Sequence, residues 1–507
     1  MSAPADDAAP SPRRSRTGLV VLGLLLAICG VTMLSVITRL TPHLRDRVLQ
    51  ALNGRFHSQV QIETLQVGIF PTPEITGTGL ALRHKGRTDV EPLITVRSFA
   101  GRAGLAGLIA TPLSLSSVDL DALTIHVPPG GVRMGERTTP AARDGSDGAA
   151  VSARSSSRLP SLVIGRITAR QARVEIASRD ARKLPRRFDI HDLVMNGFRP
   201  DAPASFTASL TNPMPRGDIE TTGEFGPWQA EDPAQTAIRG RFAFRNAKLD
   251  SIKGLGGILT ALGEYSGVLE RIAVTGETDT PAFQLDSGRR SVPLKTRFRA
   301  VVDGTNGNTV LESVEGTLAE TPIRARGAIL REEGVKGRRI ALDVSIDGGR
   351  MEDVLRLAVD SAQPPLTGRV SVASKVLVPP GEGKVIDRLQ LDGRFSLAEA
   401  RFTSYDVQKK ITMLSRRARG ETDDVGGASV VSNLHSSFVL RDGVLRLSGL
   451  SFAVPGAVVR LDGTYALRSQ AMDFKGDLLL EATLAETTTG AKAVLGKIFQ
   501  PLFRGPK

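Results

Sequence analysis

The 507-residue sequence predicts a mainly β protein, built as an elongated, curled, groove-like sheet rich in antiparallel pairs. Apolar and polar residues alternate over many short runs, which is the pattern of strands with one apolar face. The 52 glycines and 29 prolines supply turn residues between the runs. A single uncharged stretch near the N-terminus predicts one transmembrane helix, and a few short helical patterns complete the fold.

The uncharged stretch runs from Gly18 to Thr38 (GLVVLGLLLAICGVTMLSVIT). About 20 apolar residues are enough for a helix to cross a bilayer. A cleaved signal peptide is the alternative, but the run is long for one and no small-residue cleavage site follows Gly30. Cys29 suggests a lipoprotein, yet Ile28 stands where a small residue is needed. We therefore expect residues 1–17 in the cytoplasm, an anchor at 18–38, and the rest across the membrane.

Residues 41–127 are predicted to form an N-terminal β region. It opens with a short amphipathic helix over 42–56, which lies either on the membrane surface or against the sheet. Period-two alternation then begins at Val60 and continues through 80–84, 93–99 and 113–127. Residues 128–158 hold almost no large apolar side chain and are expected to be a disordered loop, whose arginines could alternatively touch lipid headgroups.

Two further β regions are predicted, a central one over 159–363 and a C-terminal one over 364–507. Their alternating runs are 162–176, 206–210, 238–249, 294–304, 323–330 and 340–349. Five Asp-Gly dipeptides predict tight hairpin turns, because this pair supplies positive φ angles. They are Asp303-Gly304, Asp347-Gly348, Asp392-Gly393, Asp442-Gly443 and Asp462-Gly463. Helical insertions are expected over 249–262 and 351–359.

So extensive a sheet must cover its apolar face with a second layer or with something other than protein. The expected helices are too few to do so. Patterning alone leaves two alternatives: the sheet closes on its own core, or it forms an open trough that holds lipid.

Sequence order and spacing favour the second alternative through a family resemblance. The stretches that carry it are LTGRVSVASKVLVPPG (366–381), residues 389–420 and residues 438–486, above all LDGTYALRSQAMDFKG (461–476). Residues 263–285, 302–316 and PTPEITGTGLAL (71–82) fit as well. In this order they resemble the AsmA family of bacterial envelope proteins. Family members often continue further at the C-terminus than Lys507.

The resemblance implies a periplasmic, inner-membrane-anchored protein that binds lipid acyl chains in a hydrophobic β groove. It further implies a part in phospholipid transfer toward the outer membrane and in envelope integrity, with an outer-membrane or periplasmic partner protein. Apolar strand residues are the candidates for the groove, although neighbours along a strand point to opposite faces. They are Leu113, Leu115, Val118, Leu120, Val444, Leu445, Leu447, Val458, Val459 and Leu461.

Motifs for chemistry are weak, so we expect neither an enzyme nor a metal or cofactor site. The six histidines show no ligand spacing, and the single cysteine excludes a Cys-rich cluster. PPGEGKV (379–385) lacks the first glycine and the Ser or Thr of a P-loop. VDGTNGN (302–308) lacks the repeated acids of a calcium loop and is interpreted as a hairpin turn. Nothing resembles the nucleophile or paired acids of a hydrolase.

The formal charge is +13, and the sequence contains two short basic runs. Arg182, Lys183, Arg186 and Arg187 are candidates for contact with anionic headgroups, and 415–419 forms a second run. Solvated surface is the plainer interpretation of both runs. Nucleic acid is not expected, because stacking aromatics are sparse. A different function remains open: exposed edge strands could make the protein a scaffold for inserting outer-membrane proteins.

Overall fold

The computed structural model describes most of the chain between residues 58 and 480. The described ranges are 58–68, 73–84, 91–104, 106–107, 113–127, 162–176, 186–229, 232–252, 254–285, 290–332, 335–358, 363–381, 385–419, 431–469 and 471–480. The expected anchor (18–38), the helix at 42–56 and the loop at 128–158 lie outside them. None of the described helices is long and apolar enough to cross a bilayer.

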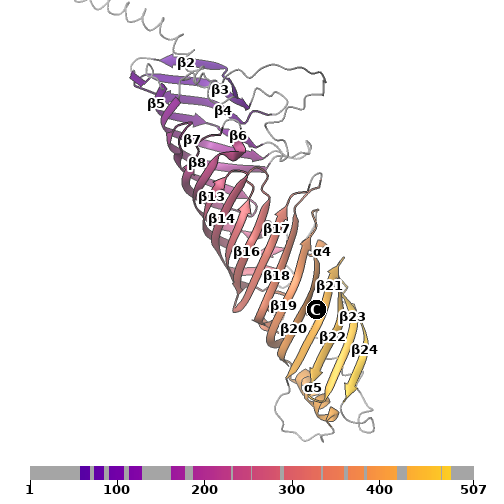
Figure 1. Ribbon diagram of the computed structural model, residues 1–507. Coiled ribbons are helices and arrows are strands. Elements are labelled where there is room, and N and C mark those ends of the chain that lie inside the picture. Colours follow the sequence, from indigo (N-terminus) through magenta and orange to yellow (C-terminus); the bar gives the residue numbers. More distant parts are fainter. Residues whose placement is uncertain are drawn as a thin grey trace, which may run out of the picture.

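The described residues contain twenty-four strands, which form one long, strongly twisted sheet (Figure 1). Nearly all neighbours pair antiparallel, and most follow each other directly in the chain. The strands are β1 (Ser58–Gln61), β2 (Thr64–Gly68), β3 (Glu74–His84), β4 (Ile94–Arg102), β5 (Leu113–Asp121), β6 (Thr124–Val127), β7 (Leu162–Ile176), β8 (Arg186–Phe198), β9 (Ala204–Pro213), β10 (Arg216–Phe225), β11 (Ala237–Lys248), β12 (Leu255–Gly256), β13 (Ile258–Val268), β14 (Arg271–Leu285), β15 (Val292–Val302), β16 (Thr309–Leu318), β17 (Thr321–Leu330), β18 (Arg339–Arg350), β19 (Leu366–Val378), β20 (Gln390–Phe402), β21 (Ser432–Arg441), β22 (Val444–Val454), β23 (Ala457–Ala466) and β24 (Met472–Leu480).

The mainly β, antiparallel-rich fold expected from the alternating runs is confirmed. The run at 162–176 coincides with β7, and the other runs fall on β3, β4, β5, β9, β11, β15, β17 and β18. One continuous sheet passes through all three predicted β regions, whose boundaries remain predictions.

A parallel pairing interrupts the antiparallel order near the N-terminal end of the sheet. β7 pairs parallel with both β5 and β6. β6 ends at Val127 beside Ile176, and β7 begins at Leu162 beside Leu113, so the end of β6 and the start of β7 are separated by the length of β7. At about 3.3 Å per residue this distance is roughly 46 Å. A parallel pair needs a long connection, and residues 128–161 provide it.

Within the described part of the chain, three α-helices are inserted between late strands: α3 (Met351–Ala358), α4 (Val385–Arg388) and α5 (Tyr405–Ala418). α3 confirms the helix expected over 351–359. The helix expected over 249–262 is wrong. That segment contains the 3-10 turn η2 (Leu249–Ser251), β12 and the start of β13, because Gly254 and Gly257 adopt positive φ angles that break a helix. A second 3-10 turn is η1 (Pro233–Gln235).

The Asp-Gly dipeptides play different roles. Asp442-Gly443 forms the tight β21–β22 turn, with φ angles of 53° and 73°, as predicted. Asp303-Gly304 lies in the β15–β16 connection, as expected for 302–308. The other three predictions are wrong: Asp347-Gly348 forms a bulge inside β18, and Asp392-Gly393 and Asp462-Gly463 lie within β20 and β23.

The clusters of buried apolar side chains lie at the two ends of the sheet. In β2–β9 they form two clusters, which include Ile75, Leu113 and Ala169. At the C-terminal end, a third cluster joins β19–β23 to α3 and α5 and contains Phe452 and Ile411. The described residues thus form an apolar core at each end of the sheet, whereas buried residues near its middle, such as Val292 and Thr280, lie outside these clusters.

Candidate functional site

One uncharged row of side chains crosses the sheet from end to end. It is defined by residues that lie directly opposite one another in neighbouring strands, which therefore point to the same face. Every strand from β2 to β24 except β6 and β12 contributes one residue. This central row is Leu65, Gly77, Phe99, Leu120, Ala169, Leu193, Ala208, Thr221, Phe242, Gly263, Gly276, Phe298, Val314, Ala325, Val344, Ser374, Gly393, Phe438, Leu447, Gly463 and Phe474.

Two further rows of side chains, which run alongside the central row on the same face, are also apolar. Beside the central row lie Ile323, Ile346, Val372 and Phe395, which are again opposite one another in β17–β20. Further along are Leu342, Val376 and Leu391. We call the side of the sheet that carries these rows the apolar face.

Aromatic rings on the apolar face lie across glycines of the next strand. The pairs are Gly77–Phe99, Gly240–Tyr265, Gly263–Phe242, Gly276–Phe298, Gly393–Phe438 and Gly463–Phe474. A methyl group on Gly263 would lie 2.6 Å from Cε1 of Phe242, and one on Gly276 would lie 3.0 Å from Cζ of Phe298. The ring therefore occupies the volume that a side chain on the glycine would need. A ring that occupies the space above a glycine projects less from the sheet. The surface is therefore smoother than one with projecting rings.

The middle of the apolar face is only half-buried. In β10–β17 the large buried apolar residues, Leu249, Val292 and Leu318, lie at or beside strand ends. Phe242, Phe298 and Val344, in the middle of their strands, remain half-buried. Helix α3 packs near the ends of β14, β15, β18 and β19, and Val385 of α4 lies 3.9 Å from the position that a methyl group on Gly254 would take. Most of the face thus has no second protein layer within the described part of the chain.

The opposite side, which we call the polar face, carries paired charges. Its side chains alternate with those of the central row along each strand. Oppositely charged residues face each other across strands, as in Arg239–Glu224 (2.6 Å), Arg297–Glu277 (2.7 Å) and Arg241–Glu264 (3.0 Å). The Glu277 carboxylate is the main cause of a raised pKa at Arg297. These exposed pairs keep the polar face soluble and contribute little stability each.

A hollow of about 1120 Å³ crosses β8–β16. At its two ends only polar-face residues line it, namely Asp192 and Val194 of β8 and Ser313 and Glu315 of β16. Their neighbours on the apolar face, Leu193 and Val314, take no part. Between these ends the lining contains two rows of polar-face residues and the central-row residues between them, among them Thr221, Phe242 and Phe298.

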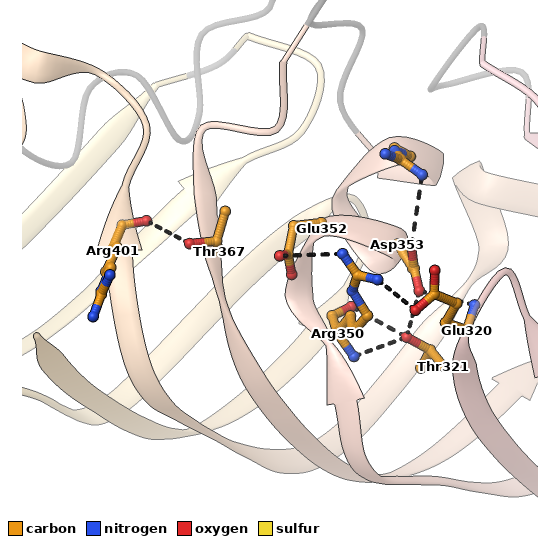
Figure 2. Close-up of polar contacts among 8 residues, drawn as sticks. Glu320, Thr321, Arg350, Glu352, Asp353, Thr367 and Arg401 are labelled. Carbon is orange, nitrogen blue, oxygen red and sulfur yellow. Dashed lines mark hydrogen bonds and ion pairs between the residues drawn. The ribbon is translucent and has the colours of Figure 1, made fainter.

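Helix α3 is fastened to the β16–β17 turn by a buried carboxylate (Figure 2). Asp353 is 2% exposed and accepts hydrogen bonds from the Glu320 backbone N–H (3.1 Å) and the Thr321 hydroxyl (3.0 Å). Arg350 extends the network by pairing with Glu320 and Glu352. These contacts hold α3 against one border of the apolar face.

The structure distributes the predicted groove residues over both faces. Leu113, Leu115 and Val118 are buried in the N-terminal cluster, and Leu120 packs against it in the central row. Four of the later residues lie on the apolar face: Leu445, Leu447, Val459 and Leu461. Val444 and Val458 project from the polar face, and Val444 is 41% exposed.

Sequence reasoning missed the half-buried rings of β11–β21, such as Phe242, Phe298 and Phe438. Their signal is a glycine directly opposite each ring, which is visible only once the strand register is known.

The predicted headgroup residues are not brought together by described contacts. Arg182 and Lys183 lie outside the described residues. Arg186 begins β8, and its side chain is not described. Arg187 is exposed and donates to Glu175 at 3.2 Å.

Groups that could perform chemistry are sparse. No cluster of three or more His, Cys, Asp or Glu side chains within the described residues could hold a metal ion. Asp303 accepts hydrogen bonds from Thr305 and Asn306 and so organises the β15–β16 turn.

Neither the models of known protein families nor the curated proteins contain a match to this chain.

Proposed function

We propose that the apolar face binds lipid acyl chains and that the protein contributes to phospholipid transfer across the cell envelope. The observation that carries the proposal is the central row, which stays uncharged across the sheet while the polar face carries paired charges. An apolar surface of this extent, most of which no described element covers, needs another apolar partner. An acyl chain fits, because each methylene withdrawn from water contributes about 0.8 kcal/mol.

The dimensions suit transfer along the sheet. Twenty steps between neighbouring strands at about 4.8 Å give the central row a length of roughly 100 Å. Acyl chains moving along it would meet Thr221 and Ser374 as the only hydroxyl side chains of the row. The hydroxyl of Thr221 is satisfied by the Tyr265 hydroxyl at 2.7 Å and by the Arg241 carbonyl at 2.8 Å. It therefore demands no polar partner from a ligand.

From the resemblance of the sequence to the AsmA family, we further propose the cellular setting of this function. In that setting residues 18–38 anchor the chain in an inner membrane, with residues 1–17 in the cytoplasm and the sheet in the periplasm. The curled sheet then acts as a groove whose apolar face shields acyl chains, while headgroups stay in water. An outer-membrane or periplasmic protein would receive the lipid at the far end.

The proposal is tested by lipid copurification and transfer. The purified full chain should carry phospholipid detectable by mass spectrometry and should move fluorescent phospholipid between vesicles. Val344→Asp and Val376→Asp, which place charges on the apolar face, should reduce both. Ser345→Asp adds the same charge beside Val344 on the polar face and should leave both unchanged. A chain that carries no lipid and transfers none would refute the function.

The edge strand β24 keeps the scaffold alternative open. Its outer edge pairs with no described strand, so it could add a strand from a client protein. Crosslinking separates the two functions: a scaffold yields client strands on β24, and a lipid carrier yields acyl chains on the apolar face.

A further inference from the structure

A pair of threonine hydroxyls lies within the apolar face. Thr278 of β14 and Thr296 of β15 are directly opposite each other, in the row that continues through Gly316 to Ile323. Both residues are half-buried, and their hydroxyl oxygens are 2.7 Å apart. The methyl group of Thr296 is directed toward β16, since its Cγ2 lies 3.0 Å from the position that a methyl group on Gly316 would take. The two hydroxyls therefore face each other across the neighbouring strands.

This threonine pair has one hydrogen-bond donor more than it uses. Each threonine hydroxyl carries one proton. The bond between Thr278 and Thr296 uses one of these protons, and neither hydroxyl makes another hydrogen bond within the described part of the chain. Other hydroxyls of the apolar face differ, because those of Ser436 and Thr221 donate to backbone carbonyls at 3.1 Å and 2.8 Å. The threonine pair therefore offers a donor to whatever covers this part of the face.

A lipid that covers the threonine pair must supply an acceptor for this donor. On the uncovered face water can accept the second proton, because the pair is half-buried. An acyl chain would displace that water without replacing its hydrogen bond, and an unsatisfied O–H costs free energy. The ester carbonyls of a glycerolipid are acceptors and lie where the acyl chains join the glycerol. The glycerol ester region is therefore the part of a lipid that complements the pair.

We propose that the Thr278–Thr296 pair donates a hydrogen bond to an ester carbonyl of the bound lipid and so favours ester-linked glycerolipids over lipids that lack this carbonyl. The inference rests on the proposed function and names the lipid class that the apolar face prefers. The contact places the glycerol beside Phe298 of the central row, while the acyl chains extend over the apolar residues around it. One neutral hydrogen bond corresponds to a preference of about fivefold.

The test captures lipid at Ile323, which lies in the same row two strands away from Thr296. A benzophenone amino acid replaces Ile323 in the full chain, which is purified in detergent. The chain is incubated with equal amounts of diester phosphatidylglycerol and its dialkyl ether analogue, with matched chain lengths. After irradiation, mass spectrometry quantifies the two adducts. We expect the ester adduct in about fivefold excess.

Two variants assign the preference to the threonine pair. Thr278→Val/Thr296→Val keeps the branched shape of both side chains and removes both hydroxyls, so the two adducts should become equal. Thr280→Val is the matched control on the same strand and the same face. The Thr280 side chain is 1% exposed and its hydroxyl has no partner among the described residues. Because a ligand cannot reach this hydroxyl, Thr280→Val should keep the ester excess.

Three results would overturn the inference. They are equal adducts when Thr278 and Thr296 are both present, an ester excess that survives their replacement by valine, and loss of the excess in Thr280→Val. In each of these cases adducts still form, so lipid binding by the apolar face stands. The absence of both adducts from the chain with the threonine pair would instead refute the proposed function, and the inference with it.

Discussion

The ring of Phe298 on β15 lies across Gly276 on β14, with Cζ 3.0 Å from the position that a methyl group on the glycine would take. The same arrangement recurs from Gly77–Phe99 near one end of the sheet to Gly463–Phe474 near the other. Because the glycine has no side chain, the ring can lie close to the sheet. The apolar face therefore has a large aromatic area with few projecting rings. Such a surface suits a ligand that moves along the sheet.

Replacing Gly276 with alanine should destabilise the sheet by about 1–3 kcal/mol, because the new methyl group meets the Phe298 ring and the Leu262 carbonyl. The cost should be smaller in a Phe298→Ala background, where the ring is absent. Urea unfolding of the two single variants and the double variant measures the coupling. Strictly additive free energies of unfolding would show that ring and glycine do not share the space.

Asp353→Ala should release α3 from the sheet. The substitution leaves the Glu320 N–H and the Thr321 hydroxyl without their buried acceptor, at a cost of about 2–4 kcal/mol. Hydrogen exchange of residues 351–358 should accelerate. Arg356→Gln removes only a half-exposed ion-pair partner at 3.7 Å from Asp353 and should cost under about 1 kcal/mol. Equal effects of the two variants would contradict the anchoring role of the carboxylate.

Tyr265 should make stability fall at alkaline pH. Burial raises the pKa of its phenol above the ordinary 10.0, and the hydrogen bond with Thr221 partly opposes this shift. The folded state therefore holds the proton more tightly than the unfolded state. The resulting stability is complete below about pH 10 and is lost as the pH rises through the folded pKa.

Urea unfolding between about pH 9 and pH 11 checks this prediction. Tyr265→Phe should decline less steeply than the native chain. In a near-ultraviolet absorbance titration, Thr221→Val should shift the Tyr265 transition further upward, since it removes the opposing hydrogen bond. A transition that stays in place in this variant would contradict the assigned contact.

Much of the fold could be predicted from local patterns, and the failures have local causes. Alternation located the strands because one face of the sheet is apolar throughout. Asp392-Gly393 and Asp462-Gly463 resemble turns in the sequence, but their glycines make room for Phe438 and Phe474 on neighbouring strands. Such a requirement comes from a residue on the neighbouring strand, so the dipeptide alone does not reveal it.

Helix α5 was not predicted for a related reason. Its buried side, Ile411, Ser415 and Ala418, is made mostly of small residues and gives a weak apolar period. The absence of glycine and proline from 403 to 419 was the available signal. For the candidate groove residues, the alternation of apolar and polar residues could not show which of Val444 and Leu445, or of Val458 and Val459, points to the apolar face. Only the strand register assigns each to its face.

The most direct test of lipid binding is photocrosslinking from neighbouring positions on the same strand. A benzophenone amino acid at Ile323 or Val344 lies on the apolar face, whereas one at Arg324 or Ser345 lies on the polar face. In cells, the first pair should form covalent adducts with phospholipid acyl chains, and the second pair should not. Adducts at all four positions alike, or at none, would contradict the account.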